Sequence, residues 1–192
     1  MKKKRTLVAC KIFEEEINYI LQKERESLDV EMVWIDAGLH SDLALLEEKL
    51  TSAIDEVKVT AENTVCLLYG RGCLPGIDSL ARQKGVSVLS ANNCLAAFAG
   101  DRVKEFEQNH AMVMTPSWVR LWPESMKRLL GWTEVDFRTN LGRYERILVL
   151  DPGLVPLTDE EILEFFDLVQ VPVEIESLSL DRFHRVLMQL ME

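Results

Sequence analysis

The chain has 192 residues, of which 47% are hydrophobic and 28% are charged, a composition typical of a folded globular protein. Its 22 Lys and Arg residues are outnumbered by 32 Asp and Glu residues, which gives a formal net charge of −10. This negative charge disfavours binding to nucleic acid phosphates and to anionic membrane surfaces, and the basic segment Met1–Arg5 is interpreted as a solvated terminus.

Short apolar runs alternate along the chain with segments in which apolar residues recur at helical spacing. A single helix is expected to carry the apolar residues from Leu95 to Phe106. The alternation predicts an α/β protein with a mainly parallel sheet of about six or seven strands and helices on both faces, a Rossmann-like three-layer sandwich. The strands are expected over residues 6–10, 30–35, 64–69, 86–89, 111–114, 146–150 and 171–175.

Polar residues before three of the helical segments are candidate helix caps. Ser41 is expected to cap the helix that follows the second strand, and Asn92 or Asn93 the helix that follows the fourth. Thr158 and Glu161 have the spacing of a capping box, in which each side chain binds a backbone N–H group of the other residue.

We interpret residues 1–192 as a single α/β domain with a Trp-rich insert at about residues 116–145. Three of the four tryptophans lie in this insert: Trp118, Trp122 and Trp132. The insert is long for a crossover between strands. It is interpreted either as a lid or association surface, through which the chain would form a homo-oligomer, or as a helix that covers one sheet edge.

The distribution of apolar residues predicts neither a membrane span nor a secretory signal. No segment approaches the ~20 apolar residues needed to cross a bilayer. The apolar run at residues 7–10 is too short for a signal core, and acidic residues 14–16 follow it. We therefore expect a cytoplasmic protein whose four cysteines are thiols or metal ligands rather than disulfides.

Three of the cysteines are expected at the carboxyl ends of strands, where ligands bind in parallel sheets. Cys10 ends the first strand, and Cys73 and Cys94 lie in the turns after the third and fourth strands. With His40, which follows the second strand, they predict a site for zinc or another thiophilic transition metal. Cys94 at a helix N-terminus is expected to have a lowered pKa. Because no pair has CxxC spacing, buried core thiols remain an alternative, and this is the interpretation for Cys66.

The turn after the third strand is rich in glycine and contains one arginine. Backbone N–H groups at Gly70 and Gly72, together with the Arg71 side chain, could bind an anionic group of a cofactor or substrate. The turn matches neither GxGxxG nor GxxxxGK[ST], so the sequence does not predict a standard nucleotide site.

Short motifs occur in a characteristic order along the chain: Leu7-Val8-Ala9-Cys10, Leu39-His40, Tyr69-Gly70 with Cys73, Cys94 with Gly100, Trp118, and Asp151 with Gly153. In these residues the chain resembles an uncharacterised domain-of-unknown-function family of methanogenic archaea and anaerobic bacteria, often encoded near corrinoid-dependent methyltransferases. Two features differ from the family pattern: Arg71-Gly72 precede the cysteine of the turn, and Asn93 replaces an aspartate.

The resemblance implies that Cys10, Cys73 and Cys94 belong to one site. From gene neighbourhood alone, the resemblance also implies a role near methyl transfer, with contact to a corrinoid and with a corrinoid or methyltransferase protein as partner.

The leading hypothesis is an accessory protein that binds a metal ion or corrinoid-related ligand through the thiolates of these cysteines. One alternative is an enzyme with Cys73 or Cys94 as nucleophile on a small anionic substrate. Another is a non-catalytic module that docks a protein through the Trp-rich insert.

Overall fold

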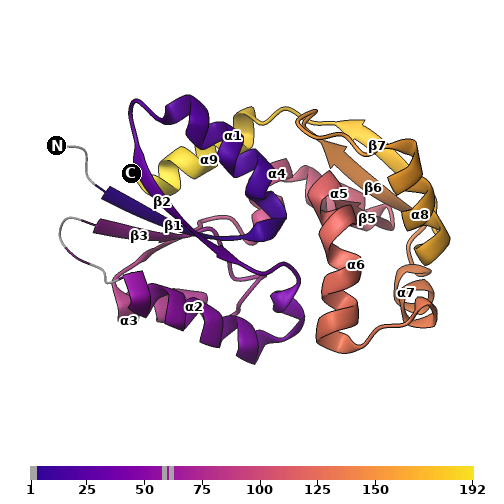
Figure 1. Cartoon of the computed structure of the whole chain (residues 1–192), viewed down its shortest axis with the longest axis horizontal. Coiled ribbons are helices and arrows are strands. Elements are labelled where there is room, and N and C mark those ends of the chain that lie inside the picture. The colour runs from indigo at the N-terminus through magenta and orange to yellow at the C-terminus, as the bar shows by residue number, and fades with distance from the viewer. Residues whose placement is uncertain (1–3, 58–59, 61–62) are drawn as a thin grey trace. The chain divides into compact units, whose positions relative to one another are not determined.

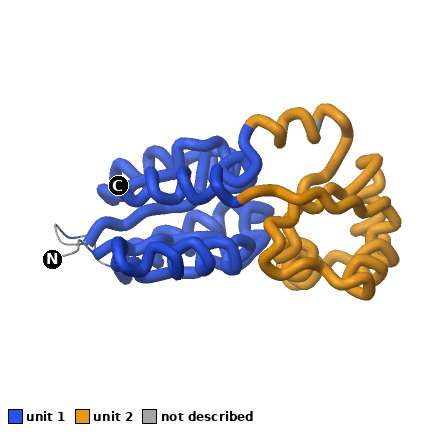
Figure 2. The backbone as a smooth tube through the Cα atoms, turned by 90° about the horizontal axis from the view of Figure 1, so that it is seen from above, with its two compact units in different colours: residues 1–100, 180–192 blue, residues 101–179 orange. Residues whose placement is uncertain are grey.

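The computed structural model describes residues 4–57, 60 and 63–192, apart from the side chain of Glu107. The chain forms two compact units, residues 1–100 with 180–192 and residues 101–179 (Figure 2). Each unit contains one parallel sheet. The predicted α/β class and its parallel strands are confirmed, but the seven strands of the described residues are divided between two sheets instead of joined in one.

The first unit is a four-stranded sheet with the strand order β2-β1-β3-β4. Its central strand β1 contains Leu7, Val8 and Ala9, which are fully buried, as expected for an apolar strand covered on both faces. Cys10 at the end of β1 pairs in register with Ile35 at the end of β2, so these strands finish at the same edge. The strands are β1 (Lys4–Cys10), β2 (Asp29–Ile35), β3 (Asn63–Leu67) and β4 (Ser87–Val88).

Helices cover both faces of this sheet. One face carries α1 and α9, and the opposite face carries α2 and α3 (Figure 1). Short 3₁₀ turns follow the first two strands, at Lys11–Phe13 and Leu39–Ser41. The helices are α1 (Glu14–Glu24), α2 (Leu43–Val57), α3 (Ile77–Lys84), α4 (Cys94–Ala99) and α9 (Asp181–Met191).

Three phenylalanines pack α9, the last helix of the chain, against the other elements of the first unit. Phe13 follows β1, Phe98 lies in α4 and Phe183 lies in α9. Their ring centroids are 5.1 to 5.5 Å apart, and their relative exposures are 0%, 1% and 0%. Tilted and edge-on aromatic pairs at this distance are favourable beyond the apolar area that they bury. The cluster therefore fixes α4, whose first residue is Cys94, against the core.

The second unit is a three-stranded sheet with the order β5-β6-β7 and four helices. The predicted Trp-rich insert corresponds to α6 and α7. Trp122, Trp132 and Phe137 pack edge to face in it, with centroids 5.2 to 5.5 Å apart. Self-association through the insert and the single-domain interpretation stay predictions. The elements are α5 (Arg102–Gln108), β5 (Ala111–Met114), α6 (Pro116–Leu130), α7 (Glu134–Leu141), β6 (Arg146–Asp151), α8 (Asp159–Val169) and β7 (Val173–Ser177).

Two of the expected caps are confirmed and one is wrong. The Asn93 side chain accepts a hydrogen bond from the first turn of α4, and Thr158 forms its capping box with Glu161. Ser41 lies within the preceding 3₁₀ turn, and it is Asp42 that caps α2 by accepting a hydrogen bond from the Leu45 N–H at 3.0 Å. Aspartate is among the most favourable residues at this position.

The single helix expected from Leu95 to Phe106 is also wrong, because the chain breaks at Gly100 into α4 and α5. Gly100 has φ of 70°, a conformation that glycine adopts readily and that ends helices. A Cβ atom at Gly100 would lie 2.7 Å from Nε of Arg182. The helical periodicity of the two segments concealed this break.

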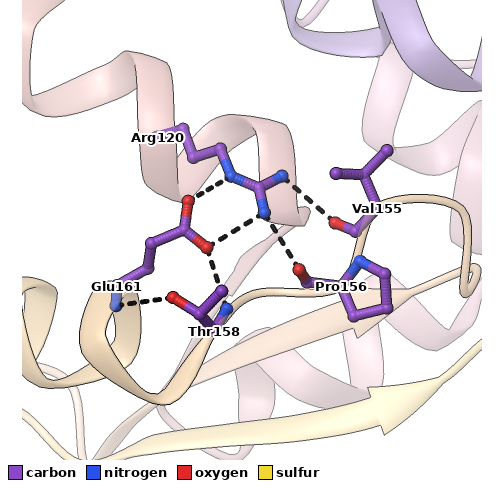
Figure 3. A network of polar contacts seen from close by, with 5 residues as sticks. All are labelled: Arg120, Val155, Pro156, Thr158 and Glu161. Atoms are coloured by element: carbon purple, nitrogen blue, oxygen red, sulfur yellow. Dashed lines mark hydrogen bonds and ion pairs between the residues drawn. The ribbon is translucent and has the colours of Figure 1, made fainter.

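An arginine links α6, α8 and the loop before α8 in the second unit (Figure 3). Arg120 Nε and Nη2 donate to the two carboxylate oxygens of Glu161 at 2.6 and 3.0 Å. The guanidinium also donates to the carbonyls of Val155 and Pro156. Hydrogen bonds from Arg120, followed by that from the Thr158 N–H, lower the pKa of Glu161 from 4.5 to about 2.

We expect Glu161→Gln to reduce the free energy of unfolding at neutral pH by about 1 kcal/mol, a figure that allows for solvent screening of this partly exposed pair. The folded-state pKa is depressed, so the stabilisation is present above pH 4.5 and is lost as the pH falls towards 2. Urea denaturation of both proteins across this range would measure the difference. Glu164→Gln, at an exposed position on the same helix, is the control, and an equal loss in the control would contradict the prediction.

Candidate functional site

The residues predicted as a metal site lie around one small cavity in the first unit. Cys10 ends β1, Cys73 lies in the turn after β3, and Cys94 is the first residue of α4. The cavity has a volume of about 20 Å³. Its walls are formed by Cys10, Asp36, Leu39, His40, Leu46, Tyr69, Cys73 and Cys94. Cys66 does not line the cavity and is buried in β3, as predicted for a core thiol.

Cys73 and Cys94 form a hydrogen-bonded pair of sulfur atoms. The Cys94 thiol donates to Cys73 and thereby lowers the Cys73 pKa, outweighing burial, and backbone N–H groups of Gly70 and Cys94 act in the same direction. Donation to Cys73, together with burial, raises the pKa of Cys94 well above its usual value. The pair therefore keeps its proton on Cys94 and its negative charge on Cys73.

The lowered pKa expected for Cys94 from its position at a helix N-terminus is thus wrong. The Leu95 N–H does lower the pKa of Cys94, but donation to Cys73 and desolvation are larger effects in the opposite direction. The helix is also short, since α4 spans only Cys94–Ala99. Its N-terminal partial charge does not outweigh burial of the thiol.

Cys10 is the third sulfur of the cavity and is protonated at neutral pH. Burial raises the pKa of Cys10 to about 11, although N–H groups of Ile12 and Gly38 partly stabilise its thiolate. The contact with Gly38 joins the end of β1 to the loop after β2, which also carries His40. Desolvation lowers the pKa of His40 although the residue is exposed to solvent, and this favours the neutral imidazole that can bind a metal ion.

Tyr69 contributes a buried hydroxyl group to the cavity wall. Its side chain is 4% exposed, and its hydroxyl forms no hydrogen bond of normal geometry with any described group. The Tyr69 hydroxyl lies close enough to Cys10 to lower the pKa of that thiol. Burial raises the pKa of Tyr69 itself well above its usual value. The sequence pattern alone does not predict Tyr69 as a ligand-binding residue. The available signal was its position after a buried strand, directly before Gly70.

Glycines bring the Cys73 turn into direct backbone contact with the Cys94 turn. The Gly72 N–H donates to the Asn92 carbonyl at 2.6 Å. A Cβ atom at Gly70 would lie 2.3 Å from the carbonyl oxygens of both Ala91 and Asn92, closer than any side chain permits. Only glycine at position 70 therefore allows the two cysteine-bearing turns to approach in this way.

The predicted anion-binding role of Gly70, Arg71 and Gly72 stays a prediction. In this structure the Gly72 N–H is donated to the neighbouring turn, and Arg71 forms an ion pair with Asp78 at 2.5 Å. An anion would have to compete with both interactions.

The sulfurs are not arranged as a coordination sphere in this structure. Over residues 4–57, 60 and 63–192, no three His, Cys, Asp or Glu side chains are positioned to hold a metal ion. A metal ion binds thiolates, so the proton that Cys73 and Cys94 share must also leave before both sulfurs can become ligands.

A larger cavity, of about 630 Å³, lies in the second unit between α6, α7 and α8. Its cationic side chains pair with carboxylates in the same wall. They are therefore less available to bind an added ligand than the sulfur atoms of the thiol cavity. The pairs are Arg120–Glu161, Lys127–Glu124 and Arg138–Glu134.

Comparison with known families assigns the chain to one of them. A family described as a protein of unknown function (DUF1638) matches residues 34–187, well over half of the sequence. The chain belongs to this family. The match includes His40, Tyr69, Cys73 and Cys94, whereas Cys10 precedes it. Membership of a domain-of-unknown-function family is thus confirmed, and the association of DUF1638 with methanogens, anaerobes and corrinoid enzymes stays a prediction.

No curated protein and no solved structure matches this DUF1638 chain. In the part of the chain that the structure describes, none of the helices combines the length and apolar character required to cross a bilayer.

We expect Gly70→Ala to destabilise the first unit by roughly 1 to 3 kcal/mol, because the added methyl group would overlap two carbonyl oxygens. Separation of the turns should also disrupt the Cys73–Cys94 pair. Gly76→Ala is the matched control, since a Cβ atom there meets no atom within 4 Å. Thermal unfolding of the two variants would test this, and equal stability would show that the turns do not need the close contact.

We expect Cys94→Ala to raise the pKa of Cys73, because the hydrogen bond from Cys94 is the largest cause of its lowered value. A hydrogen bond to a charged group of about 1.5 to 3 kcal/mol corresponds to roughly one to two pH units. Ultraviolet thiolate absorbance across a pH titration would measure the change without requiring reagent access. Cys66→Ala, which leaves the cavity intact, should titrate like the parent; an unshifted Cys94→Ala curve would refute the assigned donor.

Proposed function

We propose that this DUF1638 protein binds a single thiophilic transition-metal ion, such as zinc, through Cys10, Cys73 and Cys94. The observation that carries this proposal is the meeting of three sulfurs, from three separate turns, around one cavity of about 20 Å³. A site for one water molecule needs about 10 to 15 Å³, whereas pockets for organic ligands measure roughly 300 to 1,000 Å³. The size of the cavity favours an ion over a bound macrocycle.

The chemistry of the donors also favours such an ion. Thiolates bind zinc and other soft or borderline metals strongly, and Cys73 already carries the negative charge of its pair. Coordination by all three sulfurs would require loss of the protons on Cys10 and Cys94, so metal affinity should increase with pH. His40 lines the same cavity and is the candidate for a fourth protein ligand.

The bound ion would supply Lewis acidity towards a thiol or methyl acceptor. In this proposal the chain is an accessory protein linked to methyl-transfer metabolism, with a corrinoid or methyltransferase protein as partner. A corrinoid would contact the protein outside the thiol cavity, because the ring is far too large to enter it.

Elemental analysis of protein purified without oxygen from metal-replete cells tests the proposal. We expect about one equivalent of zinc, iron or cobalt in the parent, and loss of most of this metal in Cys10→Ala, Cys73→Ala and Cys94→Ala. Loss of one of three thiolates removes a strong ligand and with it the closed coordination geometry.

Cys66→Ala is the matched control and should retain the metal, since Cys66 lies in the core of β3. Metal-free parent protein with four free thiols would refute the proposal. Equal metal content in all variants would assign the metal to another site.

A second candidate function is nucleophilic catalysis by Cys73 on a small anionic substrate. The specific observation in its favour is the lowered pKa of Cys73, which Cys94 and two backbone N–H groups produce. This candidate requires a metal-free protein in which Cys73 is alkylated faster than Cys10 and Cys94.

A further inference from the structure

The turns that carry Cys73 and Cys94 place two sulfur atoms next to each other. Both cysteines are free thiols that line the same cavity of about 20 Å³, and their side chains form a hydrogen bond with each other. The main chains of the two turns are joined by the hydrogen bond from the Gly72 N–H to the Asn92 carbonyl. Backbone contacts therefore bring this pair of sulfurs together.

Cys10 is the third sulfur of the cavity, but its hydrogen bonds are made with other groups. Its sulfur interacts with the N–H groups of Ile12 and Gly38, and with the hydroxyl of Tyr69. No hydrogen bond joins the Cys10 side chain to that of Cys73 among the contacts that act on it. The geometry therefore distinguishes Cys73 and Cys94 as one pair among the three sulfurs.

Two adjacent thiols are the starting point for a disulfide, in which the sulfurs are joined by a bond of about 2.05 Å. Cysteines that respond to oxidants are commonly placed beside a second cysteine that completes the bond. Cys94 is the least buried of the four cysteines, so a small oxidant can reach the pair at this residue. Hydrogen peroxide, with two oxygen atoms, is an oxidant of suitable size.

We propose that a peroxide oxidises Cys73 and Cys94 to a reversible disulfide, and that this reaction releases the metal ion from the site. The release step rests on the metal-binding function proposed above. Because a disulfide sulfur is not a thiolate, oxidation removes two of the three sulfur ligands. Cys10 and His40 are then the only candidate ligands left, too few to retain the ion.

The oxidation consists of two displacements. One sulfur of the pair, as its thiolate, attacks an oxygen of the peroxide; an S–O bond forms, the O–O bond breaks and hydroxide leaves, which produces a sulfenic acid. The other sulfur then attacks the sulfur of the sulfenic acid; the S–S bond forms, the S–O bond breaks and hydroxide leaves. With the two thiol protons, the hydroxides become water. Two thiols and one peroxide thus give one disulfide and two water molecules.

The reverse reaction needs a low-molecular-weight thiol as reductant. Two thiol–disulfide exchanges restore the two cysteines and convert two molecules of the added thiol into its disulfide. The site is therefore expected to hold metal under reducing conditions and to lose it under oxidising conditions.

The first experiment uses the full chain without metal. The parent, Cys10→Ala and Cys66→Ala are treated with hydrogen peroxide, denatured in the presence of an alkylating reagent and digested, and linked peptides are identified by mass spectrometry. We expect a disulfide between Cys73 and Cys94 within one chain in all three proteins, because neither substitution removes a member of the pair. Dithiothreitol should restore four free thiols in the parent.

The second experiment measures metal release. The parent and Cys66→Ala are loaded with zinc, treated with peroxide, passed through a gel-filtration column and submitted to elemental analysis. We expect about ten-fold less zinc than in untreated protein, and recovery of binding after reduction and reloading. Cys66 does not line the cavity, so Cys66→Ala should respond like the parent.

Three results would overturn the inference. They are a bridge from Cys10 to either member of the pair, oxidation to sulfinic or sulfonic acid without a bridge, and full retention of zinc by protein that contains the Cys73–Cys94 disulfide. Failure of the reduced parent to bind zinc would instead reject the proposed metal site and the release step with it. Disulfide formation would still be decided by the metal-free experiment.

Discussion

The contact between the Cys73 turn and the Cys94 turn is the constraint on which the candidate site depends. It is a contact between main chains, made by Gly70 and Gly72 against the carbonyls of residues 91 and 92. The contact fixes the distance between the two main-chain segments that carry Cys73 and Cys94. The hydrogen bond between Cys73 and Cys94 is a consequence of this placement, and so is the position of the proton that they share.

Two opposite effects act on the protonation of the thiols in this cavity. Burial favours neutral sulfur and protonates Cys10, whereas the donors around Cys73 favour thiolate. A cation in the cavity would resolve the conflict, because its charge stabilises all three thiolates together. Without a cation, the same cavity contains the Tyr69 phenol, which acts on Cys10, and one proton shared by Cys73 and Cys94. The opposite effects on these three neighbouring sulfurs are the physical ground for proposing a cation there.

Features set by local pattern could be predicted from the sequence, and features set by long-range packing could not. Apolar runs predict that Cys10 ends a strand and that Cys73 and Cys94 follow strands, and parallel strands bring their carboxyl ends to one edge. The division into two sheets depends on strand pairing, which has no local signal. The order of the thiol pKa values depends on burial and donor geometry, and the position of the Tyr69 hydroxyl beside Cys10 depends on the same long-range packing.

The packing of Phe183 against Phe13 and Phe98 has a consequence for the order of folding. The chain leaves the first unit at Gly100 and returns to it at Leu180, so these contacts join segments separated by the whole second unit. During synthesis residues 1–100 emerge before the second unit, and the second unit can then complete its sheet from contiguous sequence before α9 is made. The core of the first unit, with the helix that carries Cys94, must wait for the last residues of the chain. Full packing of α4, whose first residue lines the thiol cavity, therefore depends on a helix that is synthesised after the second unit.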